Sequence, residues 1–303
     1  MKAHTIEPTL LFDVPGPQAR RRNRIIGLVG TVVLLAIGAY IVYRFAETGQ
    51  FSATKWSIFE YAQVQRTILD GYLNTLKAAA VASVLAVTLG AVLAAGRLSD
   101  HRWLRGPAFV LVEGFRAIPL LLLMFLFYYG APQVGLRLSP FLAVVLGLTL
   151  YNGSVLAEVF RSGVEAVPRG QSEAAFSIGL RKRQVMTTVL LPQAIRTMLP
   201  AIISQLVVLL KDTALGFLVT YPELLKELKQ LATAGEFEFP LIPLVIVGGT
   251  IYIATCLALA AIARFLERRV SRPRGSGRRG ARAEQQLDPA AEDELARTGA
   301  TGE

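Results

Sequence analysis

The sequence predicts an all-α membrane protein with six transmembrane helices. Of its 303 residues, 53% are hydrophobic and only 18% are charged, whereas soluble domains are about one quarter charged. The apolar residues come in blocks long enough to cross the roughly 30 Å hydrocarbon core of a bilayer as helices. A transmembrane β-barrel needs short alternating strands instead, and the sequence shows no such alternation.

Six apolar blocks define the expected spans. They are residues 25–43, 78–95, 107–129, 141–160, 193–210 and 244–263. The first block follows a group of arginines, is long enough to span, and has no clear small-residue cleavage site after it. These features favour an uncleaved anchor helix over a removable signal peptide.

The stretches around the spans complete the expected organisation. Residues 1–24 are expected to be a flexible leader, and residues 44–70 an extracytoplasmic segment. Residues 71–266 form the main transmembrane domain, with a cytoplasmic loop at 161–192. Residues 267–303 have almost no apolar side chains to bury and are first basic and then acidic, which is typical of a disordered tail.

The distribution of Lys and Arg predicts the orientation. With the N-terminus inside, 22 of the 32 basic residues lie in inner segments and seven in outer ones, and inner loops are the basic ones in membrane proteins. Both termini are therefore expected in the cytoplasm of a multi-pass protein of the cell membrane. The net charge of +10 then reflects topology and lipid contact, and no nucleic-acid partner is indicated.

Histidine and cysteine offer no catalytic or metal-binding cluster. Cys256 lies alone in an apolar run, and His4 and His101 are far apart in the sequence. A disulfide or a Cys-based metal site needs more than one such residue. The chain is therefore expected to be no enzyme and to bind no cofactor.

The second block carries a small residue at every fourth position. In a helix this spacing makes one stripe, and such stripes let helices approach closely in lipid. Packing within the chain is favoured over a subunit interface. The stripe consists of Ala78, Ala82, Ala86, Gly90 and Ala94.

Charged residues inside the spans are candidates for a substrate path, because ionisable groups in a membrane usually face a cavity or the bundle interior. A zwitterionic solute needs both signs along its path, and the alternative is that the charges form structural ion pairs. The candidates are Glu113, Arg116, Glu158, Lys211 and Asp212. Glu113 and Arg116 can pair on one helical face, and Pro119 is expected to kink the chain or start a helical turn.

A polar, Ala-rich segment lies between the fourth and fifth spans. A short helix is expected over 171–178, with Glu173 in the first turn, where a carboxylate suits the helix dipole. Gly179 is expected to end this helix. A second short helix is expected over about 181–190, with Pro192 ending it.

Physical reasoning from the residues gives similar weight to two interpretations of this segment. Small alanine side chains permit close docking into a groove, and a projecting Glu173 can bond to a partner's arginine. An amphipathic surface helix without a partner is the alternative.

Several motifs resemble a known family. Glu173-Ala174-Ala175, Gly179 and Leu191-Pro192 match the EAA signature of ABC-transporter permeases. Four further segments resemble those of polar amino acid importer permeases. Residues 113–121 are similar to E-x-F-R-G-T-P-L-L, 157–171 to A-E-x-x-R-x-G-I…V-P-K-G-Q, 211–215 to K-D-T-S-L and 222–225 to P-E-L-L. Within that subfamily the chain as a whole, with its N-terminal extension, looks most like the permeases of actinobacterial glutamate systems. The likeness covers about 68–266. Ala117 and Ile118 depart from the usual Gly and Thr, and the first span and the tail lie outside the common five-helix core.

The resemblance implies a non-catalytic permease subunit of an ATP-driven importer for polar amino acids, glutamate- or glutamine-like. Implied partners are a cytoplasmic ABC ATPase dimer that binds the ATP, a second similar or identical permease, and an extracytoplasmic amino acid-binding protein. The implied ATPase contact consists of Gln171, Glu173, Ala174, Ala175 and Gly179. The chain has no G-x-x-x-x-G-K-[ST] loop of its own. The alternative function is a stand-alone secondary transporter or channel for a polar solute, which predicts an inverted internal repeat that is not evident.

Overall fold

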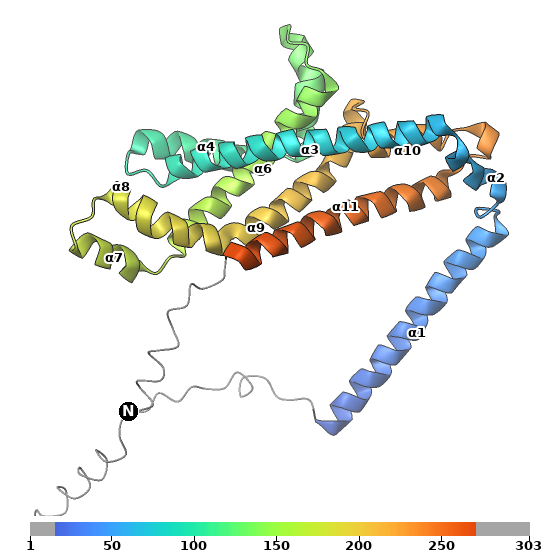
Figure 1. The fold of residues 1–303 in the computed structure, drawn as a ribbon, viewed down its shortest axis with the longest axis horizontal. Coiled ribbons are helices and arrows are strands. Elements are labelled where there is room, and N and C mark those ends of the chain that lie inside the picture. The colour runs from blue at the N-terminus through green and yellow to red at the C-terminus, as the bar shows by residue number, and fades with distance from the viewer. Residues whose placement is uncertain (1–15, 271–303) are drawn as a thin grey trace, which may run out of the picture. The chain divides into compact units, whose positions relative to one another are not determined.

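The computed structural model describes residues 16–270, which form helices joined by turns (Figure 1). The predicted all-α class is therefore confirmed. The chain divides into two compact units. One contains the described residues up to Leu73 together with Pro222–Ile251, and the other contains Asn74–Tyr221 and the residues from Tyr252 onward. Within the described residues, five helices are long and apolar enough to cross a membrane, and one bent helix pair can supply a sixth span.

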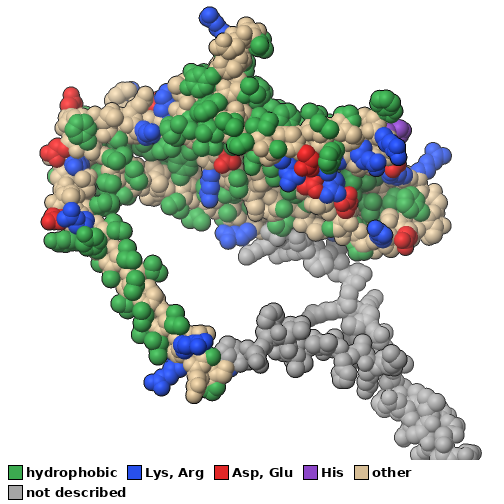
Figure 2. All heavy atoms as spheres, turned by 180° about the vertical axis from the view of Figure 1, so that it is seen from behind, with side chains coloured by type: hydrophobic (Ala, Val, Ile, Leu, Met, Phe, Trp, Pro, Cys, Tyr) green, Lys and Arg blue, Asp and Glu red, His purple; other side chains and the backbone are tan. Residues whose placement is uncertain are grey.

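The first helix, α1 (Pro17–Glu47), has no buried residue. Figure 2 shows hydrophobic side chains along it. A helix that is apolar on every side needs lipid or another apolar surface around it. Residues 17–24, which the sequence assigns to the flexible leader, are helical in α1, and the rest of that leader, residues 1–15, lies outside the described residues.

The remainder of the first unit is built from short helices and the N-terminal parts of two long ones. The short helices are α2 (Ala53–Trp56), η2 (Ser57–Glu60), α10 (Leu224–Leu231) and η7 (Gly235–Phe237). The rings of Tyr61 and Phe237 pack edge to face at 5.1 Å. A Cβ on Gly71 would lie 2.9 Å from the Cγ of Glu227, so α10 lies directly against this part of the chain. The predicted outer segment 44–70 is therefore helical and packed.

The second unit is organised around α6 (Pro140–Glu165), which packs against α4, α5, α9 and η6. Its elements are α4 (Arg102–Ala117), α5 (Leu120–Phe125), η3 (Leu126–Gly130), η4 (Ala131–Val134), α6, α7 (Arg169–Ser177), α8 (Lys182–Gln184), η5 (Val185–Leu190), α9 (Leu191–Asp212) and η6 (Thr213–Val219). Two long helices, α3 (Ala62–Arg97) and α11 (Leu241–Val270), run through both units. The core includes Leu148 and Leu156 of α6 and Leu209 of α9, all fully buried.

The small-residue stripe of α3 packs inside the chain, as predicted. All five stripe residues are buried. A Cβ on Gly90 would lie 2.9 Å from the Cβ of Leu156 and 3.0 Å from the carbonyl oxygen of Gly153. A Cβ on Gly153 would in turn lie 2.9 Å from Leu89. The absence of side chains at these two glycines lets α3 and α6 touch at the level of their backbones.

The third predicted span is broken, which corrects the expectation of one helix over 107–129. α4 ends at Ala117, α5 begins at Leu120, and the two helical stretches are bent by 99°. Ile118 and Pro119 between them have extended backbone, with ψ of 125° and 133°. Proline has no N–H to donate to the preceding turn, so the predicted kink at Pro119 is confirmed and is a complete break.

The last helix, α11, begins close to the predicted sixth span and runs beyond it to Val270. Residues 267–270, which the sequence assigns to the disordered tail, are therefore helical. The rest of the expected tail, residues 271–303, lies outside the described residues.

The contact between α3 and α6 yields a stability prediction. Gly90→Val places a branched side chain where the backbone of α6 already lies, and overpacking of this kind costs about 1–3 kcal/mol. We expect a lower thermal midpoint for the purified protein in detergent. Ala80→Val is the matched control, because Ala80 is an exposed residue of the same helix. Equal midpoints for the two variants contradict the close contact.

Candidate functional site

The loop between α6 and α9 carries the first group of candidate residues. Its helix, α7, ends at Ser177, and Gly179, two residues beyond that end, has a φ of +87°. The N–H of Gly179 donates to the carbonyl of Phe176, and the N–H of Leu180 donates to that of Ala175. These are the two hydrogen bonds of a Schellman motif, which needs a left-handed residue at this position. Since nothing lies within 4 Å of a Cβ built on Gly179, the requirement for glycine comes from the backbone and not from crowding.

The candidate residues of α7 divide between its two faces. Glu173 and Ala174 are exposed, whereas Ala175 is only 6% exposed and lies inside the chain. α7 packs on η5, so the small side chain of Ala175 allows α7 to lie close to the rest of its own chain. Phe176 and Ile178 are large apolar residues left at the surface. In the described part of the chain, Glu173 and Ala174 are thus the EAA residues available to a partner.

Two polar contacts attach this loop to the spans. The side-chain amide of Gln193, at the start of α9, donates to the Oε1 of Gln171 at 3.3 Å. Lys182 of α8 forms an ion pair with Asp100 in the turn between α3 and α4. The hydrogen bond and charge of Lys182 hold the pKa of Asp100 below its usual value, with smaller contributions from the charges of His101 and Arg105.

The second half of the loop differs from its prediction. The helix expected over 181–190 does form, as α8 and the π-helical turn η5, but Pro192 does not end it. α9 begins at Leu191 without a break, and Pro192 occupies its first turn. Inside a helix a proline lacks one backbone hydrogen bond and its ring crowds the preceding turn. Here that preceding turn is the wider π-helical η5, which gives the ring room. The loop is therefore continuous with α9.

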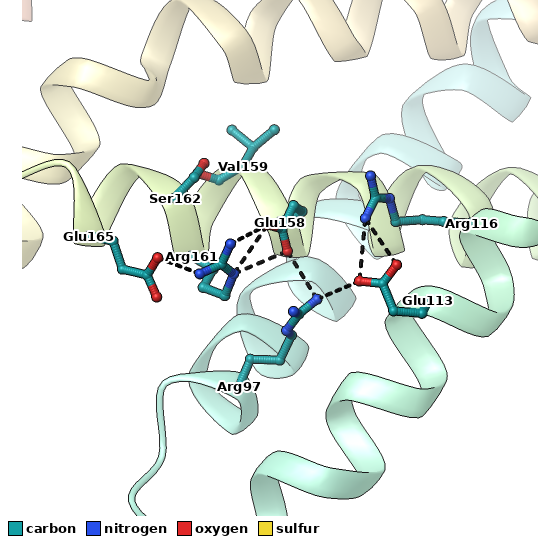
Figure 3. A network of polar contacts seen from close by, with 8 residues as sticks. All are labelled: Arg97, Glu113, Arg116, Glu158, Val159, Arg161, Ser162 and Glu165. Carbon is teal, nitrogen blue, oxygen red and sulfur yellow. Dashed lines mark hydrogen bonds and ion pairs between the residues drawn. The ribbon is translucent and has the colours of Figure 1, made fainter.

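A network of charged side chains joins α3, α4 and α6 (Figure 3). Its centre is Arg97, the last residue of α3. The Nη1 of Arg97 lies 3.0 Å from the Oε1 of Glu113 and 2.9 Å from the Oε2 of Glu158. The Arg97 side chain is only 12% exposed. One guanidinium thus binds carboxylates from two other helices at the same time.

The network extends in both directions from this centre. Arg116 reaches the Oε2 of Glu113 at 3.4 Å, as the spacing of three residues predicts. Arg161 pairs with both Glu158 and Glu165 along α6. Figure 2 shows acidic and basic side chains gathered together on a largely hydrophobic face. Three of the five proposed path residues, Glu113, Arg116 and Glu158, therefore belong to one ion-pair network.

The other two path candidates lie elsewhere. Lys211 and Asp212 are the last two residues of α9. They lie about 30 Å from the end of this helix that joins the loop. Lys211 is exposed and Asp212 is partly buried, and neither is in any of the ion pairs found among the described residues. Between these two regions, the buried Asn152 of α6 accepts a hydrogen bond of 2.7 Å from Gln205 of α9. The structure therefore divides the candidates for the substrate path into three residues that form ion pairs among the described residues and two that do not.

The sequence reasoning did not identify Arg97, Arg161 and the Asp100–Lys182 pair as part of the site. Arg97 follows the buried Ala94 by three residues and so continues the inward face of α3. Arg161 follows Glu158 by three residues, the same local spacing that indicated the Glu113–Arg116 pair. Both signals are present in the sequence. Asp100 and Lys182 are far apart along the chain, and no local spacing could have joined them.

Comparison with known proteins decides the family. Residues 86–272 match the family described as binding-protein-dependent transport system inner membrane component. The chain belongs to this family. It is a membrane-spanning permease subunit of the ABC-transporter class, as its motifs predicted, and a multi-pass membrane protein.

Its relatives carry amino acid transport names. The chain is 42% identical over 226 residues to the glutamate transport system permease protein GluD of Corynebacterium glutamicum, covering 73% of this chain and 82% of that protein. It is 34% identical over 211 residues to the probable glutamine ABC transporter permease protein GlnP of Bacillus subtilis, covering 68% and 95%. A crystal structure of an amino acid ABC transporter with histidines matches with a TM-score of 0.65 and 27% identity, covering 70% of this chain and 98% of that one.

The position of Arg97 predicts a large effect of its removal. Arg97→Met removes the partner that Glu113 and Glu158 share, and losing a hydrogen bond between charged groups costs about 1.5–3 kcal/mol. We expect a clear drop in the free energy of unfolding in detergent. Adding Glu158→Gln to the same chain should recover part of the loss, because one uncompensated charge is then removed.

Arg44→Met is the matched control for Arg97. Arg44 pairs with Glu47 on the exposed surface of α1, and exposed pairs contribute about 0–1 kcal/mol. If Arg97→Met and Arg44→Met destabilise equally, Arg97 is not the centre of a structural network.

Proposed function

We propose that the chain imports a polar amino acid of the glutamate or glutamine type, with transport driven by ATP hydrolysis in partner subunits that bind the loop between α6 and α9. In this proposal the loop and both termini face the cytoplasm. A second permease, identical or similar, completes the path, and an extracytoplasmic binding protein delivers the amino acid.

The observation that carries the proposal is the form of this loop. Its helix α7 presents Glu173 and Ala174 at the surface while Ala175 and Gln171 attach it to the chain. A carboxylate on a firmly attached helix suits a charge-assisted bond to an arginine of a partner. Because α8 and η5 run into α9 without a break, movement of the loop must move α9 as well. Rigid-body displacement of this kind is a common way to switch between conformations.

The substrate class rests on the relatives and on the unpaired charges. The two relatives described above carry glutamate and glutamine transport in their names. Lys211 and Asp212 offer one basic and one acidic group without an ion pair among the described residues, which suits the carboxylate and ammonium groups of an amino acid. The network around Arg97 is already internally paired. We therefore assign Lys211 and Asp212 to substrate contact, and Glu113, Arg116 and Glu158 to holding the helices in register.

Loop variants test the coupling. Glu173→Lys reverses the proposed contact charge, and Gly179→Val forces a branched residue into a left-handed conformation. We expect both to abolish ATP-driven uptake in proteoliposomes containing the partner subunits, with normal insertion of the chain. Glu60→Lys is the matched control because Glu60 is an exposed glutamate of the first unit.

The same assay distinguishes the alternative function. Uptake by the purified chain alone, driven by an ion gradient and unaffected by Glu173→Lys, is the behaviour of a secondary transporter and excludes the coupling proposal.

Substrate contact is tested separately. Lys211→Met and Asp212→Asn each remove a charge-assisted hydrogen bond to the substrate, a loss of about 1.5–3 kcal/mol. The KM for glutamate uptake should rise about tenfold or more, with a smaller change in kcat. Arg137→Met, at an exposed site of the same unit, should leave KM unchanged. A lower protein abundance with normal KM instead identifies Lys211 and Asp212 as structural.

A further inference from the structure

A cavity of about 470 Å³ opens where α3, α4 and α6 carry their arginines. Four arginines and one carboxylate residue line it, namely Arg97, Arg102, Arg105, Arg161 and Glu165. Phe109 forms an apolar part of the wall, and the guanidinium of Arg97 lies 5.1 Å from the centre of its ring. The cavity therefore combines a dense positive lining with an apolar side.

The positive charge of this cavity is only partly compensated. Arg97 is bound by Glu113 and Glu158, and Arg161 is bound by Glu158 and Glu165. Arg102 and Arg105 are exposed and take part in none of the ion pairs found among the described residues. The nearby Asp100 is paired with Lys182.

These two arginines give the cavity its ligand preference. Because no carboxylate of the Arg97 network pairs with Arg102 or Arg105, both are available to bind an anion. Guanidinium groups bind phosphate oxygens through paired hydrogen bonds. The lining therefore fits a phosphate group better than a neutral or cationic ligand.

The surroundings of the cavity are those of a membrane–water boundary. Arg102 and Arg105 are in the first turn of α4, and the rest of this helix presents Leu104 and Val110 at its surface. Trp103, between the two arginines, is 91% exposed. Exposed tryptophan is typical of the level of lipid headgroups. Acyl chains could therefore lie along α4 while a headgroup occupies the cavity.

We propose that this cavity binds the phosphate headgroup of an anionic phospholipid, with the acyl chains on the apolar face of α4. Basic pockets between transmembrane helices on the cytoplasmic side suit anionic headgroups. The placement of the cavity on the cytoplasmic side rests on the proposed function. The charge of the cavity and the apolar face of α4 do not depend on it. The phosphate of the bound lipid offsets one of the two positive charges of Arg102 and Arg105 and fixes the start of α4 beside the Arg97 network.

Tryptophan quenching in vesicles tests the proposal directly. The chain has two tryptophans, so Trp56→Phe leaves Trp103 as the reporter beside the cavity. The full chain is reconstituted in phosphatidylcholine vesicles that contain a small fraction of brominated phosphatidylglycerol or, separately, of brominated phosphatidylcholine. We expect stronger quenching by the anionic lipid. In the background of Trp56→Phe, the double change Arg102→Ala and Arg105→Ala should weaken the apparent affinity for that lipid by roughly 25-fold, since each surface Lys or Arg contributes about a factor of five.

The matched control removes the same charge elsewhere. Arg21→Ala with Arg22→Ala, two exposed arginines of α1, should keep the selective quenching of Trp103. Equal quenching by both lipids, or an equal loss in the two double variants, overturns the proposal. So does displacement of the lipid by low millimolar inorganic phosphate, because the cavity then prefers a soluble anion.

A protein contact is the remaining outcome that overturns the proposal. If Arg102→Ala with Arg105→Ala keeps lipid selectivity and instead loses the ATPase subunit on co-purification, the cavity is a protein interface. ATP-driven uptake measured in parallel separates the two proposals. If both lipids quench equally while uptake still needs ATP and Glu173, only the lipid-site proposal is wrong. If the anionic lipid quenches more strongly but uptake does not depend on ATP, only the coupling proposal is wrong.

Discussion

The pairing of Arg97 with two carboxylates from different helices is the interaction on which the second unit depends. A charged group near the end of a span is costly unless it is paired, and Arg97 is mostly buried. Its two partners, Glu113 on α4 and Glu158 on α6, can meet it only if these two helices pass close to the end of α3. The pairing therefore specifies the arrangement of α3, α4 and α6 more strictly than apolar packing can, because lipid is as apolar as the helices themselves.

The glycines of α3 and α6 make this pairing possible. Gly90 and Gly153 bring the two helices into backbone contact, and Arg97 and Glu158 follow them by seven and five residues. At 1.5 Å per residue, these side chains lie about 10 Å and 7 Å further along their helices, within reach of one another. A larger residue at Gly90 separates the helices and lengthens the ion pair at the same time. Close packing and charge pairing in this unit are thus coupled, and neither can be altered alone.

Sequence reasoning was most successful where the signal is local. The apolar blocks gave the spans because a bilayer imposes a minimum length on any helix that crosses it. The small stripe and the Glu113–Arg116 pair follow from helical spacing, and Gly179 follows from the need for a left-handed residue after α7. The EAA motif indicated the family, but no spacing rule showed that Ala175 turns inward while Glu173 remains exposed. That division depends on the packing of α7 against η5.

Long-range contacts account for what the sequence could not provide. Arg97 and Glu158 belong to different helices, and their meeting depends on the crossing of α3 and α6. Pro119 predicted a kink, but the 99° bend also depends on how α4 and α5 each pack against α6. Pro192 was expected to end a helix, and it instead lies within the continuous helix of η5 and α9, directly after the π-helical turn. A proline in sequence marks a special position without deciding whether a helix stops or starts there.

The short stretch from Arg97 to Arg105 connects the main features of the second unit. Arg97 holds the helix network, Asp100 holds the loop through Lys182, and Arg102 and Arg105 line the cavity. These contacts are not independent, because the positive charge of Arg105 also helps to keep the pKa of Asp100 low, after the larger effect of Lys182. Because the Lys182 hydrogen bond and charge are the main causes of the lowered pKa, Asp100 stays ionised at neutral pH and keeps its hold on the loop when an anion binds at Arg105. Because the loop continues into α9, the Asp100–Lys182 pair connects this turn to the helix that carries Lys211 and Asp212 at its far end.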